Sequence, residues 1–175
     1  MEYTYLIGIG VNYERNSTMR SLAVYDSAYG NTAKVARAIH ASLEKHGASS
    51  LKMIADVTSG DLQGIDILVI GSPTQGGRPT IPTQEFIDNL PKEVLKKTGV
   101  AIFDTRFESS EQKLALRILM GTIGYAAEKM AKSVQQRGGK ILSEPQGFIV
   151  SGKEGPLKEE ELERASTWAA KLAQT

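Results

Sequence analysis

The sequence predicts an α/β fold, in which a doubly wound parallel sheet of about five strands lies between two layers of helices. Short apolar runs alternate along the chain with stretches of helical periodicity, which is typical of strand–helix units. Two of the runs, residues 65–70 and 99–103, lack polar alternation and therefore indicate strands that are buried on both faces of a parallel sheet. No linker, repeat or low-complexity segment divides the chain. We therefore expect one three-layer domain.

The first half of the chain is expected to form strands that lead through small-residue loops into helices. Residues 22–25 form the first apolar run. Val35, Ile39 and Leu43 then mark the buried face of a helix. Gly47 is expected to end this helix as a C′ residue. An edge strand, a buried strand and a short helix are predicted next, at residues 51–55, 65–70 and 82–90.

The second half continues the pattern after one ambiguous stretch. Residues 99–103 form a buried strand, whereas residues 108–121 show no clear period. Because Glu144-Pro145 interrupts the last strand region, residues 140–150, we expect that region to be bent or in two pieces. Two helices are predicted at about residues 122–136 and 156–173, the second with Trp168 in its core stripe.

Composition and charge restrict the possible functions. The chain has 175 residues, of which 41% are hydrophobic and 23% charged, and this suits one globular domain. The formal net charge of +1 gives no electrostatic reason to expect nucleic acid as a partner. The absence of cysteine excludes disulfides and thiol catalysis, and His40 and His46 point apart on one helix, so no metal site is expected. Without a membrane-spanning run or a secretory signal, we expect a cytoplasmic protein.

The first residues do not fit the alternating pattern. They contain a Gly8-x-Gly10 pair, but Tyr13 takes the third glycine position of a dinucleotide-binding motif. We expect residues 1–18 to be an accessory extension of uncertain structure, or to belong to an upstream start so that they are not translated in the cell. Residues 19–175 are expected to form the domain.

The loop after the first strand, Ser27-Ala28-Tyr29-Gly30-Asn31-Thr32, is short and rich in hydrogen-bond donors. The N–H groups that open a helix lack partners within the helix, and the helix dipole favours an anion such as phosphate there. Ser27, Asn31 and Thr32 add side-chain donors, while the loop contains no Lys or Arg. The alternative is an ordinary strand–helix turn. The loop lacks the Gly-Lys-Ser/Thr ending of a Walker loop.

This loop resembles the FMN phosphate loop of flavodoxin-like proteins, whose pattern (Ser/Thr)-x-(Thr/x)-Gly-x-Thr directly follows the first strand. Gly71-Ser72-Pro73-Thr74 and Phe103-Asp104-Thr105-Arg106, which end the third and fourth strands, resemble the two flavin-flanking loops of this family. The resemblance covers residues 20–173 and implies the strand order 2-1-3-4-5, with the ligand near strands 1 and 3. It also implies non-covalent FMN as the cofactor and reversible transfer of one or two electrons.

The resemblance implies that three loops, 26–32, 72–79 and 104–108, hold the FMN. The implied binding residues are Ser27, Ala28, Tyr29, Gly30, Asn31, Thr32, Pro73, Thr74, Gln75, Gly76, Gly77, Asp104, Thr105, Arg106 and Phe107. Flavodoxins often have an aromatic residue where this chain has Gln75, so Phe107 becomes the best aromatic candidate for contact with the flavin. The alternative for Phe107 is packing on the apolar patch 114–120. Tyr29 is another candidate for contact with the flavin, and the alternative is that it is an exposed loop residue.

Two arginines, Arg78 and Arg106, lie in the implied flavin loops. Low-potential flavodoxins are acidic, whereas this chain is nearly neutral. A guanidinium beside the reduced, anionic flavin would stabilise it by roughly 1–2 kcal/mol after solvent screening. We therefore hypothesise a higher potential than that of acidic flavodoxins. The alternative is that both arginines point into solvent.

The sequence therefore predicts an FMN-binding redox protein that exchanges electrons with a partner protein or a small-molecule acceptor such as a quinone. One alternative is an FMN-dependent quinone or protoporphyrinogen oxidoreductase, and another is a flavin-free interaction module of the same fold. A phospho-receiver domain is largely excluded, because Gly71-Ser72-Pro73 stands where such a domain needs an aspartate. The sequence assigns no catalytic residue and leaves the electron donor, the acceptor and the oligomeric state open.

Overall fold

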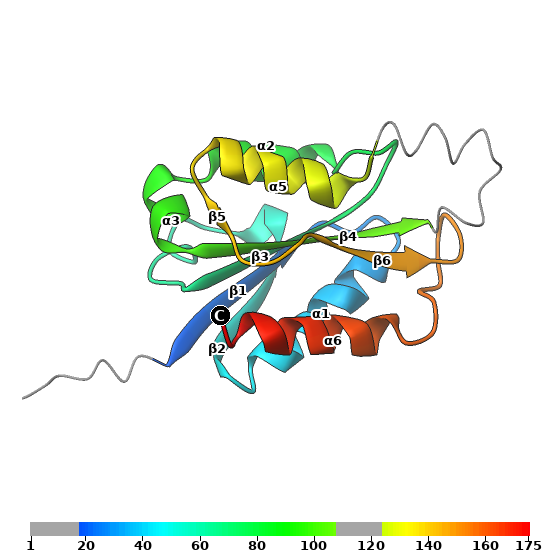
Figure 1. Ribbon diagram of the computed structural model, residues 1–175. Helices are drawn as coiled ribbons and strands as arrows, with labels where there is room; N and C mark the ends of the chain where they lie inside the picture. Colours follow the sequence, from blue (N-terminus) through cyan, green and yellow to red (C-terminus); the bar gives the residue numbers. More distant parts are fainter. Residues whose placement is uncertain (1–17, 108–123) are drawn as a thin grey trace, which may run out of the picture.

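The computed structural model describes residues 18–107 and 124–175, which form one parallel sheet with helices on both faces (Figure 1). The strands are β1 (Met19–Tyr25), β2 (Gly47–Met53), β3 (Ile67–Pro73), β4 (Gly99–Phe107), β5 (Lys140–Ile141) and β6 (Gln146–Val150). Their order is β2-β1-β3-β4-β5, and β6 also pairs with β4. The predicted order 2-1-3-4-5 is confirmed. The last strand region is in two pieces, as the Glu144-Pro145 interruption predicts.

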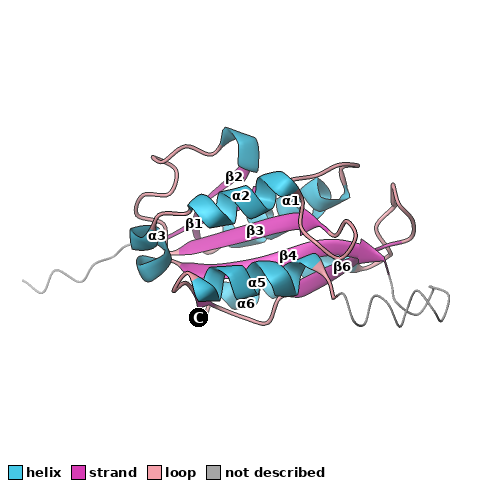
Figure 2. Ribbon diagram, turned by 90° about the horizontal axis from the view of Figure 1, so that it is seen from above, coloured by secondary structure: helices cyan, strands magenta, loops and turns pink. Residues whose placement is uncertain are grey.

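Two layers of helices enclose the sheet. They are α1 (Asn31–Leu43), α2 (Ile81–Asn89), α3 (Lys92–Lys97), α5 (Ala126–Gln136) and α6 (Glu161–Leu172), with one 3-10 turn, η1 (Ile54–Asp56). Figures 1 and 2 show α2 and α5 on one face of the sheet and α1 and α6 on the other. Among the described residues, no helix is long and apolar enough to cross a membrane. In the same residues no cluster of three or more His, Cys, Asp or Glu side chains is placed to hold a metal ion.

The alternation of side chains along β1 divides the core into two clusters. Leu22 and Val24 pack into the cluster that contains Met130 of α5, whereas Ala23 packs into the cluster that contains Val35 of α1. All five residues are at most 1% exposed, so β1 is buried on both faces. This is the environment that non-alternating apolar runs indicate in a parallel sheet.

Several elements differ from the predictions. Helix α1 ends at Leu43 with a right-handed C-cap at Glu44, so Gly47 is not a C′ residue and instead begins β2. Helix α6 begins at Glu161 rather than near residue 156, because Leu157 is extended and pairs with the end of β6. Helix α3 was not predicted, since a six-residue helix is too short to show periodicity.

Several predictions concern residues that the structure does not describe. The extension at residues 1–17 lies outside the described part of the chain. The ambiguous stretch 108–121 and its apolar patch 114–120 also lie outside it. The boundary at residue 18 between an extension and the domain therefore stays a prediction.

A cluster of three aromatic side chains joins β4, β6 and α6. The ring of Phe103 meets those of Phe148 and Trp168 edge to face, with centroids 5.8 Å and 6.4 Å apart. Phe103 and Phe148 are fully buried, and Trp168, predicted as a core residue, is 8% exposed. In the sheet, Phe103 lies beside Gly71 of β3. A Cβ atom at position 71 would come within 2.1 Å of the Phe103 ring, so only glycine fits there.

Replacement of Gly71 by Ala is expected to lower the free energy of unfolding by about 1–3 kcal/mol, because the Phe103 ring is held by its aromatic neighbours and cannot move aside. Gly60→Ala is the matched control, since its added Cβ would meet only Thr58 Oγ1 at 3.6 Å. Urea denaturation of the two variants measures the difference. Equal stability of the two variants would show that the contact between β3 and β4 adapts more easily than the geometry indicates.

Candidate functional site

A cavity of about 540 Å³ lies at the carboxyl edge of the sheet, where the loops after β1, β3 and β6 meet the end of β4. Its volume is within the usual range for a small-molecule or cofactor site. The lining residues are Ala28, Tyr29, Asn31, Thr32, Pro73, Thr74, Gln75, Gly76, Thr105, Arg106, Phe107, Val150 and Lys153. Of the residues implied by the sequence, Ser27, Gly30, Gly77 and Asp104 are not among them.

The loop after β1 presents the N-terminus of α1 to this cavity. Gly30 has φ +83°, a left-handed conformation that glycine adopts without strain, and nothing lies within 4 Å of the position of a Cβ there. The Ser27 hydroxyl stays within the loop, where its Oγ accepts hydrogen bonds from the N–H groups of Gly30 at 3.1 Å and Ala33 at 3.3 Å. The first N–H groups of α1 have no acceptor within the helix and carry the positive end of its dipole. This end of the cavity therefore suits an anion.

Two side chains of this loop have partners that local sequence could not reveal. Asn31 Nδ2 donates to the carbonyl of Glu154, 2.9 Å away, and the hydroxyls of Thr32 and Thr105 are 2.9 Å apart in a buried contact. The amide of Asn31 and the hydroxyl of Thr32 thus connect this loop to the loop after β6 and to the end of β4. Both residues also line the cavity, and the Asn31 amide has a second N–H, so their role as donors to an anion stays a prediction.

The loop after β3 contains a tight hairpin that limits its side-chain bulk. Gln75 and Arg78 exchange two backbone hydrogen bonds of 2.9 Å and 3.1 Å. Gly76 and Gly77 between them have φ +56° and +75°, and positive values at both positions are characteristic of a type I′ turn. Gln75 and Gly76 line the cavity, whereas Arg78 lines a separate groove with Ile81. Arg78 is therefore not placed to act on a ligand in this cavity.

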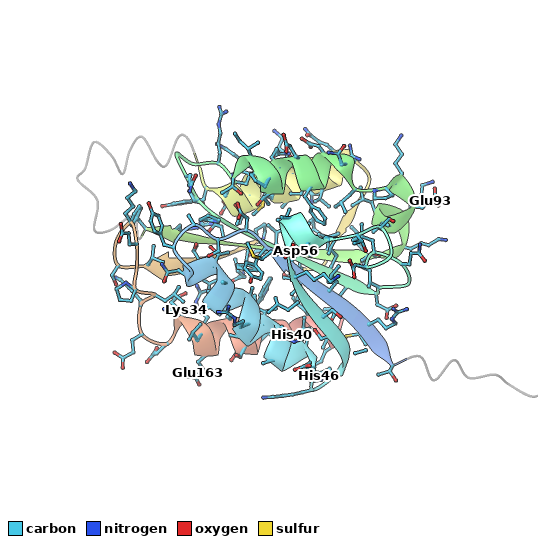
Figure 3. All side chains as sticks on the ribbon, turned by 180° about the vertical axis from the view of Figure 1, so that it is seen from behind. Lys34, His40, His46, Asp56, Glu93 and Glu163 are labelled. Carbon is cyan, nitrogen blue, oxygen red and sulfur yellow. The ribbon has the colours of Figure 1, made fainter. Side chains whose placement is uncertain are left out.

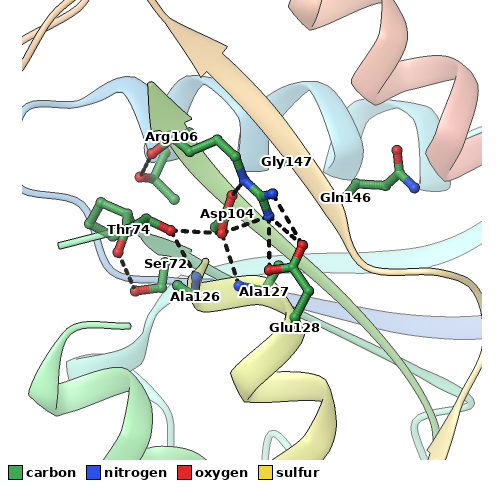
Figure 4. Close-up of polar contacts among 12 residues, drawn as sticks. Ser72, Thr74, Asp104, Arg106, Ala126, Ala127, Glu128, Gln146 and Gly147 are labelled. Carbon is green, nitrogen blue, oxygen red and sulfur yellow. Dashed lines mark hydrogen bonds and ion pairs between the residues drawn. The ribbon is translucent and has the colours of Figure 1, made fainter. Parts of the chain in front are cut away.

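The carboxylate of Asp104 is the centre of a polar network at the end of β4 (Figure 4). It is fully buried and accepts hydrogen bonds from Thr74 Oγ1 at 2.7 Å and from the N–H of Ala127 at 2.9 Å. The Arg106 guanidinium donates two more, from Nε at 2.6 Å and Nη2 at 2.9 Å. Thr74 Oγ1 in turn accepts from the N–H of Ala126. Burial raises the pKa of the Asp104 carboxyl, and the hydrogen bonds from Arg106 oppose that rise.

The positive charge of Arg106 is compensated within the protein. Besides Asp104, its guanidinium contacts the Glu128 carboxylate, with Nη1 3.1 Å from Oε1, and it stacks 4.0 Å above the centre of the Tyr125 ring. Its side chain is only 12% exposed. The hypothesis that Arg106 raises a flavin potential assumed an uncompensated guanidinium beside the cavity. The structure instead pairs it with two carboxylates, so we no longer expect that effect.

Two aromatic side chains lie at the mouth of the cavity. Tyr29 is 46% exposed and Phe107 is 41% exposed. Tyr29 lines the cavity from the loop after β1, and Phe107 lines it from the end of β4. Packing of Phe107 on residues 114–120 lies outside the described residues. The structure therefore places these two rings where a planar ligand could contact them.

Two lining residues, Val150 and Lys153, were missed by sequence reasoning. They belong to the end of β6 and the loop that follows it. A topological signal was available, because that loop also follows the carboxyl end of a parallel strand. The interrupted strand region at 140–150 made its position in the sheet uncertain. As a result, only three of the four loops around the cavity were predicted.

Comparisons with known proteins identify relatives of the chain. A family model described as Flavodoxin matches residues 24–168. A putative diflavin flavoprotein A 4 from Synechocystis sp. is 27% identical over 118 residues, which are 65% of this chain but only 17% of that protein. This chain thus spans less than a fifth of that relative's length.

Solved structures with the same fold include two flavodoxins whose chains are matched over nearly their whole length. A flavodoxin from the domain Archaea has a TM-score of 0.70 and 19% sequence identity, and the match covers 89% of this chain and 97% of that one. Oxidised Flavodoxin 2 from Bacillus cereus has a TM-score of 0.65 and 23% identity, with 89% and 98% of the two chains covered. At these identities, the likeness supports the fold.

Replacement of Asp104 by Asn is expected to lower the free energy of unfolding by about 3–5 kcal/mol, because it leaves a largely buried guanidinium partly uncompensated. Glu128→Gln is the matched control, since it removes the other carboxylate from the same guanidinium. Glu128 is 52% exposed, so its loss is expected to cost about 0–1 kcal/mol. Urea denaturation measures both values. Equal losses for the two variants would contradict the central role of the buried carboxylate.

Proposed function

Because the chain belongs to the flavodoxin family, it is an FMN-binding redox protein, and we propose that it works as an electron carrier whose flavin lies in the cavity at the carboxyl edge of the sheet. The observation that carries this proposal is the continuity of the cavity. The cavity extends from the N-terminus of α1 to the loop after β3 and the last residues of β4. An elongated molecule with an anionic end and a planar end matches this arrangement.

The residues present fit FMN in their chemistry. The open space in front of Gly30 and the N–H groups at the start of α1 suit the phosphate. Pro73, Gln75 and Gly76 form a side of the cavity with little side-chain bulk, against which the flavin ring fits. Phe107 offers an aromatic contact at the end of β4. The flavin, when bound, supplies the reversible uptake of one or two electrons. The chain's own residues bind and orient it and leave part of the cavity mouth open to a partner.

Flavodoxin-like carriers exchange electrons with redox partners, and we propose a partner protein here. The exposed rings of Tyr29 and Phe107 at the cavity mouth support contact with another protein surface. The apolar segment that suggested a quinone acceptor lies outside the described residues, so reduction of a quinone stays the second candidate. We infer a cytoplasmic location from the sequence alone. A flavin-free interaction module is disfavoured, because the cavity and its anion-binding loop are both formed.

The first test is the visible absorption spectrum of the purified protein, recorded before and after addition of FMN and gel filtration. We expect oxidised-flavin bands to remain with the protein, since the described segments around the cavity are joined to one another by hydrogen bonds between protein groups. A folded protein that remains colourless after FMN is added would refute the proposed function.

Gly30→Ala is expected to weaken FMN binding by at least about tenfold, because a residue with a Cβ resists the left-handed conformation that shapes the loop. Gly138→Ala is the matched control. Its φ of +86° is almost the same as the +83° of Gly30, and the space around both positions is open, but Gly138 follows α5 at the opposite edge of the sheet. Quenching of FMN fluorescence measures the affinity, and urea denaturation measures stability.

Both variants are expected to lose about 1–2 kcal/mol of stability, the cost of a left-handed residue with a side chain. Only Gly30→Ala is expected to lose FMN affinity. If both variants bind FMN as the wild type does, the loop at residues 27–32 does not hold the phosphate.

A further inference from the structure

The loop between β6 and α6 is a compact turn. The Ser151 N–H donates to the carbonyl of Pro156 at 2.9 Å, and the Gly155 N–H donates to the carbonyl of Gly152 at 3.0 Å. At the base of the turn, Val150 pairs with Leu157 in an antiparallel bridge. The turn therefore has its own hydrogen bonds, and its position does not depend on a ligand.

This turn is held against the loop that follows β1. Asn31 Nδ2 donates to the carbonyl of Glu154 at 2.9 Å. A Cβ atom at Gly155 would lie 2.6 Å from the same Asn31 nitrogen, so the two loops approach closely enough to require glycine. Because Glu154 and Gly155 are fixed beside Asn31, the residue that precedes them is also held near the N-terminus of α1.

That residue is Lys153, which is exposed and lines the same cavity as Tyr29 and Asn31. Among the described residues that line the cavity, one other is a cation, Arg106, which is paired with two carboxylates. Within the described part of the chain, no carboxylate forms an ion pair with Lys153. Of these two described cations, Lys153 is therefore the one whose charge no carboxylate compensates.

We infer that Lys153 binds the phosphate of FMN and makes the site prefer FMN to riboflavin, its analogue without phosphate. This inference rests on the proposed function. The loop at residues 27–32 contains no cation, and the side chains of Asn31 and Thr32 each already make a hydrogen bond to another part of the protein. A phosphate monoester carries nearly two negative charges at neutral pH, and Lys is a common point charge for phosphate. The turn after β6 thus supplies the charge that the loop after β1 lacks.

The test compares FMN and riboflavin binding to the flavin-free protein, measured by quenching of flavin fluorescence. Lys153→Gln is expected to weaken FMN binding by about tenfold, a magnitude that allows for the exposure of the lysine, and to change riboflavin binding by less than about twofold. Lys153→Arg keeps the charge and is expected to retain most of the FMN affinity. The affinity of the wild type for FMN is also expected to fall more steeply with salt than that of Lys153→Gln.

Lys34→Gln is the matched control. Lys34 follows the same loop but lies on the exposed side of α1 and does not line the cavity (Figure 3). This variant is expected to bind both flavins as the wild type does. Equal effects of Lys34→Gln and Lys153→Gln would indicate a general charge effect and would overturn the inference.

Two further outcomes separate this inference from the proposed function. If Lys153→Gln weakens FMN and riboflavin binding equally, or changes neither, Lys153 does not recognise the phosphate, although the wild type still binds FMN. If the wild-type protein binds neither flavin, the proposed function fails and this inference fails with it.

Discussion

The buried carboxylate of Asp104 is the interaction on which the geometry of the site depends. It receives hydrogen bonds from the loop after β3, through Thr74, from the end of β4, through Arg106, and from the first turn of α5, through Ala127. A carboxylate without water around it needs several donors, and these three elements are held where they can provide them. Backbone pairing of β3 with β4 runs as far as Pro73 and Thr105, and the carboxylate adds the side-chain contacts that join this end of the sheet to α5.

A second set of contacts connects the two ends of the cavity. The hydroxyl pair of Thr32 and Thr105 joins the start of α1 to the end of β4, and the contact of Asn31 with Glu154 joins it to the turn after β6. These hydrogen bonds lie between protein groups and exist without a ligand. The described part of the site is therefore formed without a ligand, so a ligand would not have to supply the free energy that brings these described segments together.

The sequence predicted the parts of this arrangement that depend on local patterns. Apolar runs located β3 and β4, and a run of small residues with donors located the loop at 27–32. The partners of Asn31 and Thr32 could not be predicted in this way, since Glu154 and Thr105 are 123 and 73 residues away in the chain. The pairing of Arg106 with Glu128 was missed for the same reason, and Lys153 was missed because the loop that carries it had no clear place in the predicted sheet.

The distribution of charge around the cavity follows from these long-range contacts. At the end formed by β4, the positive charge of Arg106 faces two carboxylates, so the cluster has a net charge of −1 when both are ionised. At the end formed by α1, the helix dipole and Lys153 provide positive potential without a facing carboxylate among the described residues. An anionic group is therefore favoured at one end only. This asymmetry supports the proposed orientation of FMN, with its phosphate at α1 and its ring between the loop after β3 and the end of β4.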